Sequence, residues 1–163
     1  MNTGSGGLSV RIDDRETTVT MTGGGVWRMP IGPLSLVDGE LERADRPTPT
    51  QLTNALGVVQ DHFDDVVRDS PMVEAAPSIE FVGPHALEVA YVEFGARELP
   101  APYAVRRADL DEVFRTIVAE PIAERLHNPG LDPEHVESIV ATCCVILAII
   151  RRLDHQSATI GTP

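Results

Sequence analysis

Carboxylates gather in two places, residues 61–65 and residues 112–124, at spacings that raise the question of acid–base chemistry. On a helical projection, Asp61, Asp64 and Asp65 share the polar face of an amphipathic segment, so we interpret them as solvated residues rather than a catalytic pair. The second group receives the same interpretation. The residues concerned are Asp61, Asp64, Asp65, Glu112, Glu120 and Glu124.

The histidines do not form a recognisable ligand motif. None of the five has the compact spacing of a zinc site, and they occur at His62, His85, His127, His135 and His155. Ser5 stands between two glycines but lacks the spacing of a nucleophile elbow and an identifiable base. The sequence therefore predicts neither a zinc enzyme nor a serine hydrolase, and it offers no catalytic residue.

Cysteine and lysine usage excludes further chemistries. Cys143 and Cys144 are adjacent, about 3.8 Å apart at Cα, which is shorter than the usual disulfide separation of about 4.4–6.8 Å. We interpret them as reduced, small core residues of a cytoplasmic protein. All 13 basic residues are arginine, which excludes a P-loop lysine and Schiff-base catalysis.

The charge balance limits the class of partner. A formal net charge of -12 argues against nucleic acid and weighs against any polyanionic substrate. No stretch reaches the roughly 18 apolar residues of a membrane span, and the N-terminus lacks the pattern of a secretion signal. We expect a cytoplasmic protein that binds neither nucleic acid nor membrane.

The first third of the chain has a strand pattern followed by a long helix. Residues 8–12 and 17–22 predict a hairpin around a turn at 13–16, and residues 26–29 resume the strand before the irregular stretch at 30–33. An amphipathic helix of about five turns follows. Either Thr48, with Pro49 at the first helical position, or Thr50 is its N-cap.

The remainder alternates short strands and helices. Residues 79–82 predict a buried strand, residues 86–94 a helix that stops at Gly95, and residues 110–118 a helix broken near Pro121. The clearest helix is almost wholly apolar from 139 to 150, with Asp132 as its expected N-cap. A further strand is expected after His155.

This order predicts one α/β or α+β layered domain over residues 1–163. It begins with a β-hairpin or meander and continues with interleaved helices and strands.

Four segments, taken in order, resemble the second half of the exopolyphosphatase and guanosine pentaphosphatase (Ppx/GppA) family. Its pattern is an Asp-Ile-Gly-Gly-Gly-Ser loop, a Leu-Pro-Leu-Gly strand and turn, a strand leading to Gly-Thr, and Pro-Gly-Leu-x-Pro before an apolar helix. The corresponding segments are Asn2-Thr3-Gly4-Ser5-Gly6-Gly7, residues 29–36, Phe81-Val82-Gly83, and residues 129–134.

The resemblance implies a ribonuclease H-like lobe of the actin, Hsp70 and sugar-kinase superfamily. It implies a phosphate site at Gly4, Ser5, Gly6, Gly7 and Gly83, because a glycine-rich turn brings backbone N–H groups close to an anion. Polyphosphate or guanosine pentaphosphate would be the ligand. The arginine-rich, alanine-rich composition suits an actinobacterial member.

The chain departs from the family pattern at the positions that hold magnesium. Asn2 and Ser9 stand where the family has an aspartate and a glutamate, so Asn2 remains as a weak magnesium ligand. Pro84 removes a backbone donor after Gly83. His85 is expected to be a solvated loop residue, with a phosphate contact as the alternative.

The resemblance also implies that the first lobe, with its phosphate loop and catalytic glutamate, is absent. Met1 directly abuts the glycine-rich turn, so we expect a truncated or split family member that is incomplete as an acid-anhydride hydrolase.

Three hypotheses therefore stay open. The chain is a hydrolase half that needs a separate first domain, a non-catalytic interaction module that binds a protein partner or forms a homodimer, or an unrelated α/β domain. In the third case, the glycines, including Gly23, Gly24 and Gly25, are only turns.

Overall fold

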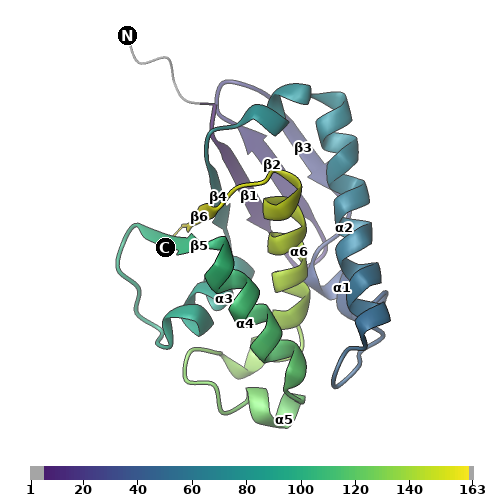
Figure 1. Ribbon diagram of the computed structural model, residues 1–163, viewed down its shortest axis with the longest axis vertical. Coiled ribbons are helices and arrows are strands. Elements are labelled where there is room, and N and C mark those ends of the chain that lie inside the picture. The colour runs from purple at the N-terminus through teal and green to yellow at the C-terminus, as the bar shows by residue number, and fades with distance from the viewer. Residues whose placement is uncertain (1–5, 162–163) are drawn as a thin grey trace.

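The computed structural model describes residues 6–161 and shows a six-stranded sheet with helices packed against it (Figure 1). The strands are β1 (Leu8–Ile12), β2 (Thr17–Met21), β3 (Val26–Met29), β4 (Ile79–Val82), β5 (Tyr103–Arg106) and β6 (Ser157–Ile160). The α-helices are α1 (Pro33–Asp38), α2 (Pro49–Asp69), α3 (Pro84–Phe94), α4 (Arg107–Ala119), α5 (Ile122–Arg125) and α6 (Ile139–Arg152). Two 3₁₀ turns, η1 (Pro71–Ala75) and η2 (Pro133–His135), complete the description.

The sheet has the strand order β3-β2-β1-β4-β6-β5. Strands β1, β2 and β3 form an antiparallel meander, which confirms the predicted hairpin. Strand β4 pairs with β1 and with β6 in parallel, and β5 closes the far edge antiparallel to β6. In β1, residues Leu8, Val10 and Ile12 are buried while Ser9 and Arg11 are not, so the helices cover one face of the sheet.

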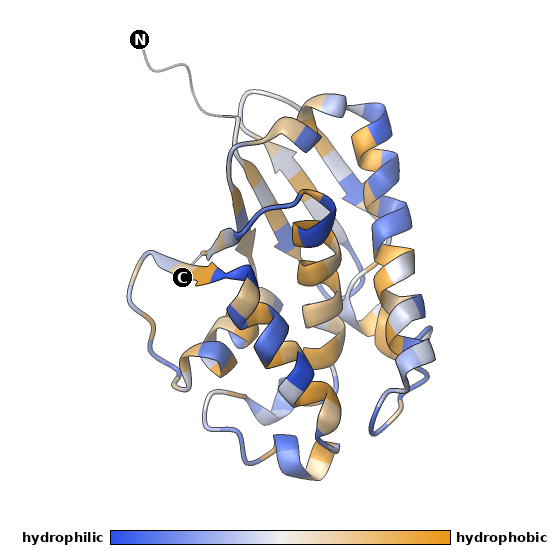
Figure 2. Ribbon diagram, viewed as in Figure 1, coloured by the Kyte–Doolittle hydropathy of each residue, from blue (hydrophilic) through white to orange (hydrophobic). Residues whose placement is uncertain are grey.

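Local signals explain the two longest helices. The Thr48 hydroxyl accepts a hydrogen bond from the Gln51 N–H, and the Gln51 side chain accepts one from the Thr48 N–H. This capping box, with Pro49 behind it, starts α2 and decides between the two expected caps. Helix α6 packs between α2 and α4, and every residue from 139 to 150 is buried. Figure 2 shows α6 as an almost unbroken apolar rod.

The core contains both cysteines as free, buried thiols of α6. Removal from water raises the pKa of the Cys143 thiol to about 12 and also raises the pKa of Cys144. Both thiols therefore remain protonated at neutral pH.

Three expectations about element boundaries need correction. Residues 103–106, for which no element was predicted, form β5; their partner β6 lies some fifty residues further along the chain, so no local pattern marks the strand. Asp132 accepts from the Glu134 N–H and caps the 3₁₀ turn η2, whereas α6 begins only at Ile139. Helix α3 begins at Pro84, two residues earlier than expected.

Candidate functional site

The predicted glycine-rich turn covers residues 2–7, of which the structure describes Gly6 and Gly7. Gly6 and Gly7 precede β1, and the Gly7 carbonyl accepts a hydrogen bond from the Thr22 N–H at 3.0 Å. Asn2, Gly4 and Ser5 lie outside the described residues, so their predicted magnesium and phosphate contacts stay predictions.

Gly83 lies at the opposite end of the sheet. It follows β4 with a φ of +105°, and a Cβ added to it would lie 3.0 Å from the Ile12 carbonyl oxygen. Since β1 and β4 are parallel, with Leu8 opposite Ile79, Gly7 and Gly83 are separated by about five residues of strand, or roughly 16 Å. The structure does not bring Gly6 and Gly7 together with Gly83, so one phosphate cannot contact both.

The carboxyl ends of β1 and β4 instead border an open hollow of about 630 Å³. Parallel strands in α/β proteins characteristically bind ligands at this end. Three segments meet there, namely the β1–β2 turn, the first turn of α3, and η2. The hollow is lined by Arg11, Asp13, Asp14, Arg15, Glu16, Pro84, His85 and His135.

His85 is the buried group of this hollow. The residue is 4% exposed, so the expectation of a solvated loop histidine is wrong. Its Nε2 lies 2.7 Å from Oδ1 of Asp14, which is exposed on the β1–β2 turn. The ring of His135 stands edge-on to it, with centroids 5.1 Å apart. The Nδ1 atom of His85 is buried and has no hydrogen-bond partner.

The backbone of the β1–β2 turn is fixed by hydrogen bonds and by close packing against the segment that begins α1. The Asp13 N–H donates to the Glu16 carbonyl, and the Leu34 N–H donates to the Asp14 carbonyl at 2.8 Å. A Cβ on Gly32 would lie 2.5 Å from the Asp13 carbonyl oxygen, so only glycine permits this approach. The turn therefore presents side chains to the hollow on a fixed backbone.

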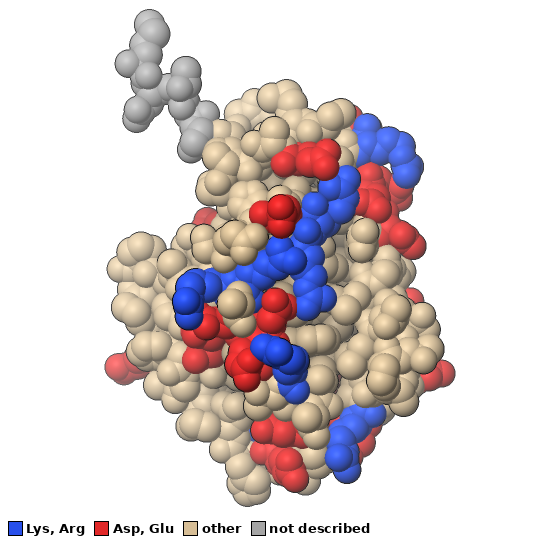
Figure 3. Space-filling model, in the orientation of Figure 1, with Lys and Arg blue, Asp and Glu red and all other residues tan. Residues whose placement is uncertain are grey.

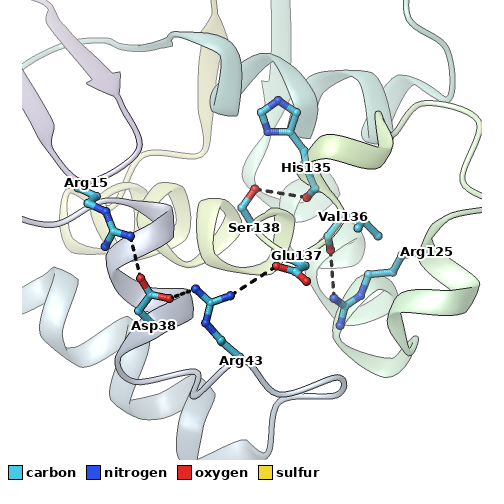
Figure 4. A network of polar contacts seen from close by, with 8 residues as sticks. All are labelled: Arg15, Asp38, Arg43, Arg125, His135, Val136, Glu137 and Ser138. Carbon is cyan, nitrogen blue, oxygen red and sulfur yellow. Dashed lines mark hydrogen bonds and ion pairs between the residues drawn. The ribbon is translucent and has the colours of Figure 1, made fainter.

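The arginines beside the hollow already have acidic partners. Arg11 pairs with Asp13 at 3.1 Å, and Arg15 pairs with Asp38 of α1 at 2.8 Å. Asp38 also binds Arg43, which reaches Glu137 at 3.9 Å, and Figure 4 shows this chain of contacts extending away from the turn. The hydrogen bond from Arg15 holds the pKa of Asp38 below its ordinary value.

The carboxylates considered first for acid–base chemistry lie elsewhere. Asp64 of α2 pairs with Arg152 at 2.7 Å, Asp65 pairs with Arg68 at 2.8 Å, and Glu112 of α4 pairs with Arg115. Within residues 6–161, no three His, Cys, Asp or Glu side chains gather in a way that could hold a metal ion. The described residues thus do not fit a preformed magnesium site.

Sequence reasoning missed Asp14 and His135 as members of a site. Asp14 was visible only as part of a turn, and His135 only as one of several scattered histidines. Their meeting with His85 depends on the pairing of β1 with β4, which no local pattern reveals. Chemically, the hollow offers imidazole and guanidinium donors together with carboxylate acceptors.

No family model matches the chain, and no curated protein matches it by sequence. Its structure does resemble solved structures. An exopolyphosphatase-like protein superposes with a TM-score of 0.83 at 20% identity, over 96% of this chain and 55% of its own. The Ppx/GppA enzyme of Aquifex aeolicus gives 0.82 at 14% identity, over 95% and 52%.

An exopolyphosphatase of Cytophaga hutchinsonii gives a TM-score of 0.70 at 17% identity, over 96% of this chain and 53% of its own. These likenesses confirm the predicted ribonuclease H-like α/β fold. The chain spans about half the length of the structures it matches. None of its helices within residues 6–161 is long and apolar enough to cross a membrane.

Proposed function

We propose that this chain is a member of the Ppx/GppA family that forms one lobe of a phosphoanhydride-binding protein, with its ligand at the hollow between the β1–β2 turn and α3. The observation that carries this proposal is the position of the hollow. It lies at the carboxyl ends of β1 and β4, at the first turn of α3, where N–H groups without intrahelical partners favour an anion.

The proposed lobe does not hydrolyse its ligand alone. Within residues 6–161, no three His, Cys, Asp or Glu side chains gather in a way that could hold a metal ion beside the hollow. Asp14 is bound to the buried His85 at 2.7 Å. Holding reactants in place contributes about 7 kcal/mol or more to catalysis, so turnover requires a second lobe that closes over the hollow. The ligand is a polyphosphate or guanosine pentaphosphate, and the setting is the cytoplasm.

Reconstitution tests this function. The chain is mixed with the separately expressed first lobe of a Ppx/GppA protein, and phosphate release from polyphosphate and from guanosine pentaphosphate is measured. We expect no release from either lobe alone and measurable release from the mixture. Calorimetry of the mixture with both ligands provides the decisive control. Absence of any binding heat with either ligand contradicts the proposal.

A second candidate is a non-catalytic interaction module, and the pairing of the arginines favours it. Ten of the 13 arginines form ion pairs within the chain. Figure 3 shows most of the visible arginines beside acidic residues. The surplus carboxylates suit a positively charged protein partner better than a polyanion. Light scattering and pull-down experiments decide, because a strict monomer without a partner contradicts this role.

A further inference from the structure

Two imidazoles and a buried unpaired nitrogen make the hollow different from a glycine-lined phosphate loop. The β1–β2 turn carries Asp13, Asp14, Arg15 and Glu16 instead of glycines, and its backbone is packed against Gly32. An anion in this hollow must therefore meet side chains. Besides the arginines, the hollow offers the rings of His85 and His135. His85 is bound to the Asp14 carboxylate through Nε2, and its Nδ1 has no partner.

We propose that the hollow holds a tetrahedral oxyanion through protonated His85 and His135, so that occupancy of the site is linked to uptake of protons. This inference rests on the proposed function and names the groups that control ligand binding at the same site. Histidine is the side chain whose charge ordinarily changes between about pH 5 and 8.

The hydrogen-bond inventory of His85 supports the proposal. Because Nε2 faces the Asp14 carboxylate, the neutral ring places its proton on Nε2 and leaves Nδ1 as a buried acceptor without a donor. Protonation places a second proton on Nδ1, which then needs an acceptor. In the proposed bound state, an oxyanion beside the adjacent His135 ring supplies that acceptor. The protonated, anion-bound state satisfies both ring nitrogens.

The net charge of the side chains that line the hollow depends on whether the two histidine rings are protonated. Two arginines face three carboxylates, which leaves one net negative charge while both rings are neutral. A proton on each ring gives one net positive charge. With both rings neutral the hollow would repel an oxyanion, and with both rings protonated it would attract one.

The other charged groups near the rings are committed elsewhere. Glu88, one turn along α3, binds Arg97 at 2.8 Å and accepts from the Asp132 N–H. Glu134 and Glu137, on either side of His135 in sequence, are exposed, and Glu137 faces Arg43. Asp38 of α1 is bound to Arg15. The carboxylate in direct contact with His85 is that of Asp14.

Sulfate is the probe, because it is tetrahedral and stays a dianion across this pH range. Its affinity for the full chain is measured by calorimetry at pH 5.5 and 7.5 at one ionic strength. We expect binding to be roughly tenfold tighter at pH 5.5, the scale set by adding charges a few ångströms from the anion. His135→Asn should lose most of this gain, whereas His127→Asn, an exposed histidine outside the hollow, should retain it.

Asp14→Asn provides an independent arm if His135→Asn does not fold. It removes an exposed negative charge from the hollow and should tighten sulfate binding at pH 7.5. Equal sulfate affinity at both pH values overturns the inference, as does a pH effect that survives His135→Asn. If pyrophosphate binds with the same affinity at both pH values and in both histidine variants, the inference is wrong but the proposed function is retained. Failure of both anions to bind at either pH removes both.

Discussion

Arg125 and His85 are 2% and 4% exposed, yet the fold treats these two buried polar side chains differently. The Arg125 guanidinium donates to the carbonyls of Ile117, Val136 and Asp45, so each of its nitrogens has a partner (one of these bonds is drawn in Figure 4). His85 has one partner, and its Nδ1 has none. Complete satisfaction is the signature of a structural residue, whereas an unpaired buried nitrogen beside a hollow is typical of a functional one.

The environment of Arg125 explains why it needs no carboxylate. Burial lowers its pKa, but Ile117 lies in the last turn of α4, where the helix dipole is negative. The three carbonyls come from three segments, so one side chain ties α4, η2 and the loop before α2 together. His85 ties only the β1–β2 turn to α3, through an exposed carboxylate.

The largest effect is expected from Arg125→Leu. The change leaves three carbonyls without their donor in the core, and the free energy of unfolding should fall by about 3–4 kcal/mol. Urea denaturation followed by circular dichroism measures it. Arg115→Leu is the matched control, because Arg115 forms only an exposed i,i+3 pair with Glu112 and should contribute under about 0.5 kcal/mol. Equal losses in the two variants would remove the structural role assigned to Arg125.

A second prediction uses Cys143, which interacts electrostatically with Arg125 and reports how dry that region is. Its pKa is raised from 9.0 to about 12 in the folded chain. The folded state therefore keeps a proton that the unfolded state loses above pH 9. Stability should fall between pH 9 and 12 by about 1.4 kcal/mol per pH unit for this thiol. Cys143→Ala should reduce the measured slope by that amount.

The stability of Cys143→Ala at pH 7 serves as the reference for its stability at alkaline pH. At pH 7, both folded and unfolded thiols are protonated, so the alanine change affects stability only through packing, with no pH slope. A Cys143→Ala slope identical to that of the parent chain between pH 9 and 12 would show that water reaches the thiol. The core around Arg125 would then not exclude water, and it would no longer contrast with the solvent-accessible hollow beside His85.

The sequence was informative wherever a short segment decides its own structure. Thr48, Pro49 and Gln51 form a cap within four residues, and the hairpin of β1 and β2 closes over a four-residue turn, so both were predictable. Strand β5 was missed because Tyr103 to Arg106 become a strand only by pairing with β6. The hollow was missed for the same reason, since Asp14 and His85 are 71 residues apart.

The glycines Gly6 and Gly7 and the hollow lie at opposite ends of β1. Gly6 and Gly7 match a phosphate loop in composition, but they enter the sheet at the amino end of β1. Ligand sites of this architecture form at the carboxyl end, where β1 passes into the Asp13–Glu16 turn. That turn contains no glycine, so composition alone gave no signal there.

The smallest stability effect is expected from His85→Leu, and it tests the comparison most directly. Leucine removes the unpaired Nδ1 from the core, and the freed Asp14 carboxylate is exposed and can be hydrated. The free energy of unfolding should therefore change by less than about 1 kcal/mol, or rise. Sulfate binding at pH 5.5 should nevertheless be lost. Retention of a side chain that costs stability points to a function. A loss of stability as large as that of Arg125→Leu, with sulfate binding retained, would instead make His85 a second structural residue.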